Sequence, residues 1–401
     1  MNTRATPKFE YISTRQALTD LLDKIRPSAR IALDTEADSF HHYYPKVCLI
    51  QGTAENVNFI IDPLAGINLT DFFNIILPKK LIIHDAGYDL RMLKADFDFQ
   101  PEGEIFDTML AGRMLGLEKV GLSALLGDFL GLQIHKQNQR ADWSKRPLSQ
   151  ELLAYAIVDT HYLPALADLL AARLETLGRS QWHRQTCLGS VRSALQSKND
   201  NQTEENWRIR GVSRLNPKQM AFVRELWRWR EKEAQKEDVP PFRVMYSNQL
   251  LALSCWLAAQ KNPAQKKLNK LPRSCRGPRL AALKKAVEKA AALPEEQWPQ
   301  RKKPDFSKQP SCLQQSQIEI LRRSAAQIAA SLNLPPQWIA PKALLGSIVL
   351  RKLDTPEKLI RSNLMTPWQA ELLAPILSEV FSEKSPRTAP DSESAPGTSP
   401  P

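Results

Sequence analysis

Two acidic side chains, separated by one residue, end a short apolar run near the N-terminus. The run Ile31–Leu33 leads directly into Asp34 and Glu36. In a β-strand, side chains at positions i and i+2 leave the same face of the sheet, so the two carboxylates would point the same way. Two carboxylates side by side at the end of a buried strand are costly unless a cation lies between them. The pattern therefore indicates either a divalent metal site or an exposed strand end with two solvated acids.

Two further acids fall where local structure would carry them toward the same place. Asp89 lies in the first turns of a helix predicted over residues 85–97, directly after a short apolar strand. Tyr155 and Asp159 are four residues apart in a helix predicted over residues 150–177, so they share one helical face. Four inward-facing carboxylates would repel one another, and two Mg²⁺ or Mn²⁺ ions would relieve that repulsion because hard cations prefer oxygen ligands. Two such ions can activate a water molecule and stabilise the leaving oxygen of a phosphodiester.

The elements that must position these residues are predicted from the spacing of apolar side chains. In the N-terminal half, short β-rich runs alternate with segments of helical period, which indicates an α/β domain. The turn over residues 52–56 predicts a hairpin, and Pro164 predicts a kink in the last long helix. The predicted strands are 31–34, 47–51, 57–62 and 81–84, and the predicted helices are 13–25, 85–97, 105–115, 122–130 and 150–177.

Composition divides the rest of the chain. Residues 198–206 are polar and are predicted to form a linker, after which helical patterns dominate. A Pro-rich basic break over residues 293–310 splits this helical half in two. The resulting prediction is an α/β domain over residues 1–200, two small all-α domains over residues 211–292 and 311–382, and a disordered tail of Ser, Pro and acidic residues over 383–401.

The charge of the chain indicates an anionic partner. The 401 residues carry a net charge of +12, and residues 201–310 hold 24 Lys and Arg against 11 Asp and Glu. Residues 261–289 contain ten basic side chains opposed by Glu288 alone. Such a run can be a solvated helix face, but an imbalance of this size favours phosphate binding. Nucleic acid is favoured over a membrane surface, because the chain has no amphipathic anchor and no apolar run of spanning length.

Cysteine usage and the N-terminus indicate the compartment. The five cysteines are far apart and form no Cys-x-x-Cys pair, which argues against a zinc ribbon and against a disulfide framework. Residues 1–8 are polar and lack an apolar signal core, so we expect the protein in the cytoplasm.

Three segments resemble, in order, the three motifs of the DEDDy 3′–5′ exonucleases, and within them the ribonuclease D family. The segments are Asp34–Glu36, His84–Leu90 and Tyr155–Asp159. The likeness covers about the first 180 residues, and three motifs in order are far more specific than any one of them. Supporting strings are Tyr44–Pro45, Leu49–Gln51, Phe106–Thr108, Ala141–Trp143 and Arg146–Leu148.

The resemblance implies an RNase H-like α/β fold, with a mixed sheet flanked by helices, and hydrolysis from a 3′ end that releases nucleoside 5′-monophosphates. It implies that Asp34, Glu36, Asp89 and Asp159 are metal ligands and that Tyr155 holds the attacking water. It further implies that Asp34 bridges both ions, whereas Glu36 serves one ion and the water or substrate end. A tyrosine with a pKa near 10 is a poor base at neutral pH, so we expect it to orient the water rather than deprotonate it.

The helical half resembles HRDC domains, the small helical modules that accompany this exonuclease in ribonuclease D. The likeness is carried by Leu215–Gln219, Leu226–Glu231, Val239–Pro241 and Asn248–Leu257. Residues 311–382 resemble a second, diverged copy, mainly in position, helical period and the region of Trp368. Relatives tend to have Gly-Trp-Arg there, whereas this chain has Pro367–Gln369, which puts a substrate role of that region in doubt.

Several other residues are candidates for substrate binding, each beside a structural alternative. His84 can lie at the pocket edge or be a satisfied strand-end histidine. Trp143 and Arg146 can contact substrate or pack against the long helix. We interpret His41 and His42 as loop residues, and Asp107 as the acceptor of a structural hydrogen bond on an apolar helix. The candidate set is Thr35, His84, Trp143, Arg146, Lys266, Lys267, Lys270 and Arg273.

The function that follows is a metal-dependent 3′–5′ exoribonuclease that trims structured RNA precursors such as tRNA. The alternatives are a DNA exonuclease for proofreading or repair, and a non-catalytic RNA-binding scaffold, against which the complete set of acids argues. No residue is identified that would sense a 2′-hydroxyl, so RNA over DNA depends on the resemblance. The expected partners are RNA 3′ ends, with no membrane and no obligate protein partner, and we expect a monomer.

Overall fold

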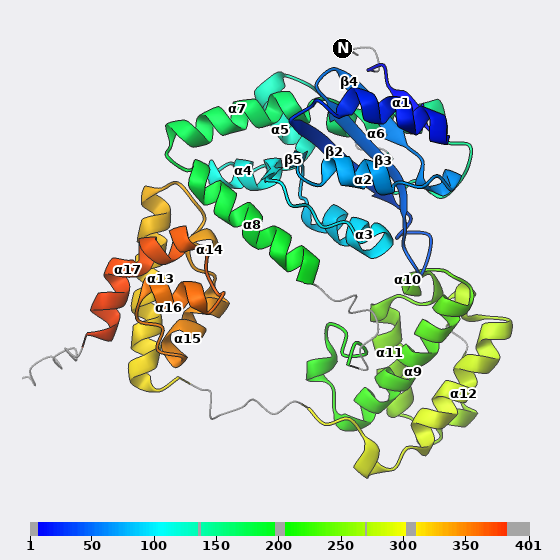
Figure 1. The fold of residues 1–401 in the computed structure, drawn as a ribbon. Coiled ribbons are helices and arrows are strands. Elements are labelled where there is room, and N and C mark those ends of the chain that lie inside the picture. Colours follow the sequence, from blue (N-terminus) through cyan, green and yellow to red (C-terminus); the bar gives the residue numbers. More distant parts are fainter. Residues whose placement is uncertain (1–6, 135–137, 197–204, 269–270, 302–309, 383–401) are drawn as a thin grey trace, which may run out of the picture. The chain divides into compact units, whose positions relative to one another are not determined.

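The computed structural model describes residues 7–134, 138–196, 205–268, 271–301 and 310–382 (Figure 1). The chain forms two compact units, residues 1–305 and residues 306–401. The predicted tail over 383–401 and most of the linker predicted over 198–206 lie outside the described residues. Within the described ranges, no helix combines the length and the apolar composition needed to cross a membrane.

A mixed six-stranded sheet forms the centre of the N-terminal domain, in the order β1-β4-β3-β2-β5-β6 (Figure 1). β3 pairs antiparallel with β2 and β4, and the remaining pairs are parallel. The predicted hairpin of β3 and β4 and the predicted mixed sheet are confirmed. The strands are β1 (Glu10–Ile12), β2 (Arg30–Ala37), β3 (Val47–Ala54), β4 (Val57–Ile61), β5 (Lys80–Ile83) and β6 (Ile105–Asp107).

Helices cover both faces of this sheet. Ile31 and Leu33 of β2 belong to a core shared with α1, α2 and α3, whereas Leu49 and Ile60 belong to a second core under α6. Alternate residues of a strand face opposite sides, so Asp34 and Glu36 lie on the face away from Leu33. The helices are α1 (Arg15–Ile25), α2 (Thr70–Ile76), α3 (Gly87–Phe97), α4 (Thr108–Met114), α5 (Leu122–Leu130), α6 (Gln150–His161), α7 (Leu163–Thr176) and α8 (Ser180–Gln196).

Two predicted helices differ from the structure. The helix predicted over 150–177 is two helices, α6 and α7, because Pro164 lacks an N–H and its ring clashes with the preceding turn. The helix predicted over 105–115 begins as strand β6, and α4 starts only after Asp107. A three-residue apolar run is too short for its period to distinguish a strand from a helix.

The helical part of the first unit is built around α9 (Pro217–Lys236). It packs with α11 (Ser247–Ala258) and α12 (Pro278–Ala292), and the short α10 (Pro241–Val244) follows α9. The second unit contains α13 (Cys312–Ser331), α14 (Pro336–Ile339), α15 (Lys342–Leu350), α16 (Pro356–Arg361) and α17 (Pro367–Phe381). Trp368 is buried in the core of this unit, which gives it a packing role.

The first three helices of the two helical parts, α9 to α11 and α13 to α15, start at a common spacing of 95 residues. α9 and α13 have 20 residues each, and α10 and α14 have 4 residues each. In both copies a capping box begins the long helix. A residue of positive φ then precedes two prolines, the second of which begins the short helix. Matched positions are Asn216 and Ser311, Asp238 and Asn333, Pro241 and Pro336, and Leu250 and Leu345.

Candidate active site

A pocket of about 530 Å³ opens where the acidic end of β2 meets α6 and the start of α3. Carboxylate oxygens of Asp34, Glu36 and Asp159 lie within 4.8 Å of one another in this pocket. Asp89 and Tyr155 line the same pocket. The structure therefore brings together the five residues that the sequence predicted as the catalytic centre.

The register of β2 explains why two of the acids face α6. Asp34 and Glu36 lie opposite Gln51 and Leu49 of β3, and α6 packs on these two strands. On α6, the four-residue spacing of Tyr155 and Asp159 places both side chains on the turn that faces the pocket. The residue spacing of a strand and that of a helix thus place these side chains in one pocket.

Asp89 reaches the pocket because β5 ends early. β5 pairs with β2 only as far as Ala32, and the chain then turns into α3, which leaves the acidic end of β2 open on that side. Thr35 donates hydrogen bonds to Asp89 Oδ1 from its backbone nitrogen (3.1 Å) and from Oγ1 (2.5 Å). Thr35, which was predicted to bind substrate, therefore holds Asp89 in place while lining the pocket.

Three carboxyl groups of the pocket have raised pKa values. Burial raises the pKa of Asp34 well above its ordinary range, and the charges of Asp89, Asp159 and Glu36 raise it further. Burial, together with Asp159 and Asp89, raises the pKa of Glu36 to about 9. Burial raises the pKa of Asp89 to about 6, against the lowering effect of the Thr35 hydrogen bonds. Buried acids that hold their protons in one pocket would be stabilised in their ionised form by a divalent cation.

Tyr155 keeps its proton in this environment. Burial raises the pKa of its phenol, and the charges of Asp159, Glu36 and Asp34 add to the effect. A phenol that keeps its proton at neutral pH can donate a hydrogen bond but is a poor base. This agrees with the orienting role expected from the sequence.

Gln51 is a residue of the site that the sequence analysis missed. It lies opposite Asp34, is fully buried, and donates a hydrogen bond from Nε2 to Asp34 Oδ2. Its Oε1 is buried and has no hydrogen-bond partner among the described residues. An amide in a strand that is otherwise apolar was the available signal, because a buried polar side chain needs a partner.

Phe40 and Tyr88 were also missed. Both are exposed and both line the acidic pocket. Tyr88 lies inside the second motif, but aromatic character alone does not distinguish a pocket residue from a core residue. Exposed rings beside an acidic pocket offer faces on which flat aromatic ligands can stack.

His84 and Asp107 shape the turn between β5 and α3. His84 lines the pocket, and its Nδ1 lies 2.9 Å from Thr108 Oγ1, so it is both a pocket-edge residue and a satisfied histidine. Asp107 accepts hydrogen bonds from the backbone nitrogens of Asp85 and Ala86 and caps α4. Its predicted structural role is confirmed, although it ends strand β6 rather than lying on a helix.

Trp143 and Arg146 do not line the pocket, and the contacts of both agree with the packing alternative given for them in the sequence analysis. Trp143 is 0% exposed and packs behind Tyr155, with ring centroids 6.2 Å apart. Arg146 donates to both carboxylate oxygens of Asp62 at 2.6 Å and to the carbonyl oxygen of Cys48 at 2.8 Å. Both side chains are thus engaged in packing the segment that supports α6.

The two loop histidines and the basic candidates also lie outside the residues that line this pocket. His41 Nε2 lies 3.2 Å from the carbonyl oxygen of Arg140, and His42 Nε2 lies 3.3 Å from Ser144 Oγ. Three of the basic candidates are exposed side chains of the helical part, and the fourth, Lys270, lies outside the described residues. The three are Lys266, Lys267 and Arg273.

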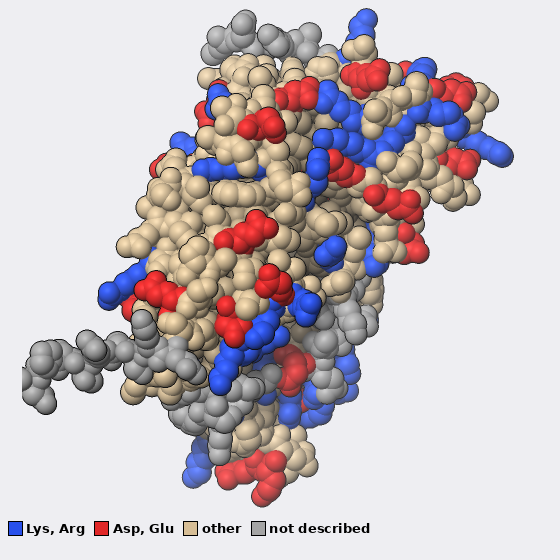
Figure 2. Space-filling model, turned by 60° about the vertical axis from the view of Figure 1, so that its left-hand side comes forward, with Lys and Arg blue, Asp and Glu red and all other residues tan. Residues whose placement is uncertain are grey.

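One face of the molecule carries charge of both signs. On the face shown in Figure 2, basic and acidic side chains are interspersed and do not form one continuous basic surface. The net charge of +12 therefore does not by itself locate a nucleic-acid interface. A binding surface has to be argued from local groups of side chains.

Comparison with known proteins agrees with this site. Residues 9–175 match the 3′–5′ exonuclease family model, and residues 219–267 match the HRDC domain model. The chain is 28% identical over 354 residues to ribonuclease D of Gluconacetobacter diazotrophicus, covering 86% of this chain and 87% of that protein. It is 29% identical over 373 residues to ribonuclease D of Zymomonas mobilis, covering 90% and 91% of the two chains.

The fold agrees as well. The crystal structure of RNase D from Escherichia coli superimposes with a TM-score of 0.66 and 22% sequence identity, covering 94% of this chain and 99% of that chain. The exonuclease match spans all four acids and Tyr155, and the HRDC match lies in the helical part that follows. The chain is therefore similar to ribonuclease D over most of its length, with a 3′–5′ exonuclease domain followed by an HRDC domain.

Proposed function

We propose that this enzyme removes nucleotides one at a time from RNA 3′ ends and releases nucleoside 5′-monophosphates. In this proposal Asp34, Glu36, Asp89 and Asp159 hold two divalent ions, Mg²⁺ or Mn²⁺, and Tyr155 orients the attacking water. The observation that carries the proposal is the group of three carboxylates whose oxygens lie within 4.8 Å of one another, in one pocket with Asp89 and Tyr155. Carboxylate oxygens are the ligands that both ions prefer.

The ions, when bound, would activate the water and stabilise the leaving 3′-oxygen. The protein supplies position and hydrogen bonds. Thr35 fixes Asp89, Gln51 fixes Asp34, and the buried Trp143 ring backs Tyr155. Because the raised pKa of Tyr155 keeps its phenol protonated, the hydroxyl can hold the water by a hydrogen bond without taking its proton. Asp34 is assigned to both ions, and Glu36 to one ion and the water.

The size and lining of the pocket suit an RNA end. About 530 Å³ lies in the range that holds a single small ligand, and is too little for a duplex. The exposed rings of Phe40 and Tyr88 would stack on the terminal bases. A frayed or unpaired 3′ end is therefore the substrate that the pocket would accept.

The proposed physiological substrates are structured RNA precursors such as tRNA, processed in the cytoplasm by a monomer. The similarity to proteins called ribonuclease D over most of the chain supports RNA as the substrate. The E. coli RNase D, which shares the fold, is described as an exoribonuclease involved in structured RNA processing. In this proposal the helical parts hold the body of the RNA.

A digestion of matched RNA and DNA oligonucleotides, labelled at the 5′ end, tests the proposal. With Mg²⁺ or Mn²⁺ we expect a ladder that shortens from the 3′ end, faster on RNA than on DNA. Asp34→Asn should keep RNA affinity and lose mononucleotide release, whereas Asp23→Asn, which removes an exposed charge on α1, should behave as wild type. Faster digestion of DNA would favour the DNA exonuclease, and binding without release by the wild type would favour the scaffold.

A further inference from the structure

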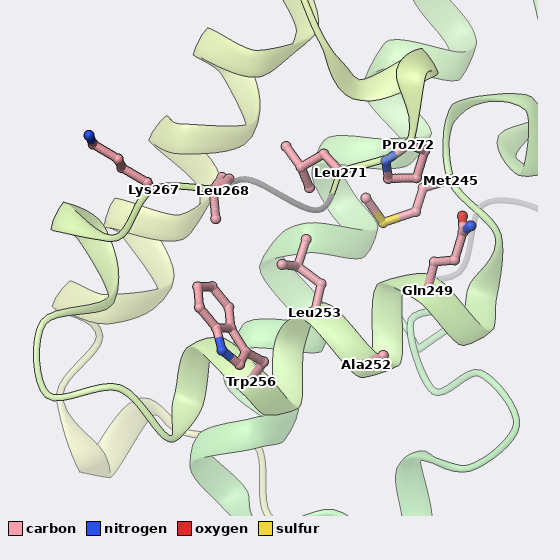
Figure 3. Close-up of a pocket in the computed structure, with 9 residues that line it drawn as sticks. All are labelled: Met245, Gln249, Ala252, Leu253, Trp256, Lys267, Leu268, Leu271 and Pro272. Carbon is pink, nitrogen blue, oxygen red and sulfur yellow. The ribbon is translucent and has the colours of Figure 1, made fainter.

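A cavity of about 800 Å³ lies in the helical part of the first unit and shares no residue with the acidic pocket (Figure 3). Leu253 and Trp256 of α11 form one wall, and Leu268 and Leu271 face them from the segment before α12. A second hollow of about 500 Å³ shares Gln249 and Pro272 with this cavity, so the two hollows are adjacent. We call the two hollows together the aromatic groove.

Three large aromatic side chains remain open to solvent along the aromatic groove. Trp256 is 43% exposed in the first hollow, and Tyr246 and Phe242 are 57% and 37% exposed in the second. The rings of Phe242 and Tyr246 stack, with centroids 6.1 Å apart and an angle of 23° between their planes. Aromatic rings left together at the surface are typical of a binding site, because burying them elsewhere would stabilise the protein.

The internal repeat shows that the fold does not require these rings. In the second copy, core positions keep their apolar character, as with Leu226 and Leu321, which are both fully buried. The positions 95 residues after Phe242, Tyr246 and Trp256 are instead occupied by Gln337, Pro341 and Arg351, the last of which follows the end of α15. The second copy thus keeps buried core positions without these three rings, so that core does not depend on them.

The charge beside the aromatic groove identifies its occupant. Residues 261–289, which include one wall of the groove, carry ten basic side chains and one acidic side chain. Two of the ten, Arg279 and Lys289, are paired with Glu237 and Glu225 from α9 and the residue that follows it. Figure 3 shows Lys267 on the rim, with its ammonium group directed away from the apolar lining. Lys266, Arg273 and Arg276 are also exposed on this segment. The exposed rings and the basic side chains together suit a ligand that has flat apolar faces and a regularly charged backbone. Single-stranded nucleic acid has both, whereas the base faces of a duplex are stacked inside it.

We propose that the aromatic groove binds unpaired nucleobases of RNA, which stack on Trp256 at one end and on Tyr246 at the other, with phosphates beside Lys267 and Arg273. The choice of RNA as the ligand rests on the proposed function. The inference that bases stack in the groove rests only on the exposed rings that line it. Stacking is tolerant of base identity, so the site would select single-stranded over paired regions rather than a sequence. The groove would then hold unpaired parts of a substrate whose 3′ end enters the acidic pocket.

Binding of fluorescein-labelled RNA to the full chain, followed by anisotropy in EDTA, tests this proposal. We expect Trp256→Ala to weaken binding of an unstructured RNA of about 12 nucleotides about tenfold, which is the loss of one base–aromatic stack. Trp256→Phe should retain most of the affinity, and Tyr246→Ala should weaken binding independently at the other end. For an abasic strand of the same length, the affinities of wild type and Trp256→Ala should be equal. The same should hold for a blunt duplex of that length.

A charge control separates stacking from electrostatics. Lys285→Ala removes an exposed lysine of α12 that does not line the groove, and should weaken single-stranded, abasic and duplex RNA by the same factor. Thermal melts establish that each variant is folded, which is expected because Trp256 and Tyr246 are exposed.

Two results would overturn the proposal. One is that Trp256→Ala binds the unstructured RNA as tightly as the wild type does. The same result is expected if the groove binds a protein segment instead of RNA. The other is an equal loss for the abasic strand, which would exclude base stacking. Because the measurement is made in EDTA, it does not depend on hydrolysis, so failure of the exonuclease proposal and failure of the groove proposal are seen in separate assays.

Discussion

Binding of Mg²⁺ or Mn²⁺ should tighten steeply as the pH rises, because the acids of the pocket must lose protons to become ligands. Glu36, whose pKa is raised to about 9, is the clearest case. At pH 7 such a carboxyl is protonated in about 99 of 100 metal-free molecules, and removing the proton costs about 2.7 kcal/mol. While one proton is displaced per site, the apparent Kd should fall about tenfold for each pH unit between about 6 and 8.5.

The neighbouring acids increase this dependence. The pKa of Asp34 is raised well above its ordinary range, so its proton is displaced as well and the slope becomes steeper. Since the two groups interact, the protons belong to the pair rather than to either residue. One to two protons should therefore be released for each metal-binding event near pH 7.

Isothermal titration calorimetry in two buffers of different ionisation enthalpy measures both the Kd and the protons released. Glu36→Gln should flatten the pH dependence and lower the number of protons released, because the amide has no proton to lose. Asp23→Asn should leave both quantities unchanged, because its side chain is exposed on α1. A Kd that does not change between pH 6 and pH 8.5, with no proton release, would refute the reasoning.

Three further predictions concern the residues around the acids. In EDTA the melting temperature should fall as the pH rises from 5 to 9: carboxyls with raised folded-state pKa values stabilise the fold while protonated, and this contribution is lost as the pH passes about 6 for Asp89 and about 9 for Glu36. Glu36→Gln should flatten this trend, and a rising melting temperature would contradict it. Gln51→Leu should weaken metal binding about tenfold by removing the hydrogen bond to Asp34, as calorimetry would measure, and an unchanged Kd would exclude a positioning role. Trp143→Ala should lower the free energy of unfolding in urea by about 3–5 kcal/mol, whereas Trp143→Phe should cost less because the buried indole Nε1 has no hydrogen-bond partner among the described residues. If Trp143→Ala instead raised KM without a loss of stability, the ring would belong to the substrate site.

The acids could be predicted from the sequence because their grouping depends on local geometry. The i, i+2 spacing of Asp34 and Glu36 and the i, i+4 spacing of Tyr155 and Asp159 fix a shared face for each pair. The order of strands and helices then brings the two faces to one end of the sheet. Only Asp89 required tertiary information, because its orientation depends on hydrogen bonds from Thr35, 54 residues earlier.

The remaining features could not be predicted because they depend on partners distant in sequence. Trp143 has an aromatic side chain of the kind that can stack on a substrate. Its burial results from packing between the sheet and α6. The partners of Arg146 include Asp62, which is 84 residues away, and no local pattern indicates that pair. The strand at Ile105–Asp107 exists because β5 offers it a parallel edge, which a three-residue run cannot reveal.

Anomalous diffraction from crystals of the active enzyme soaked in Mn²⁺ tests the central claim most directly. The claim is that the carboxylates of the acidic pocket hold the ions used for hydrolysis. Two anomalous peaks about 4 Å apart, within coordinating distance of oxygens of Asp34, Glu36, Asp89 and Asp159, are the predicted result. An active preparation that shows no Mn²⁺ among these carboxylates would contradict the account.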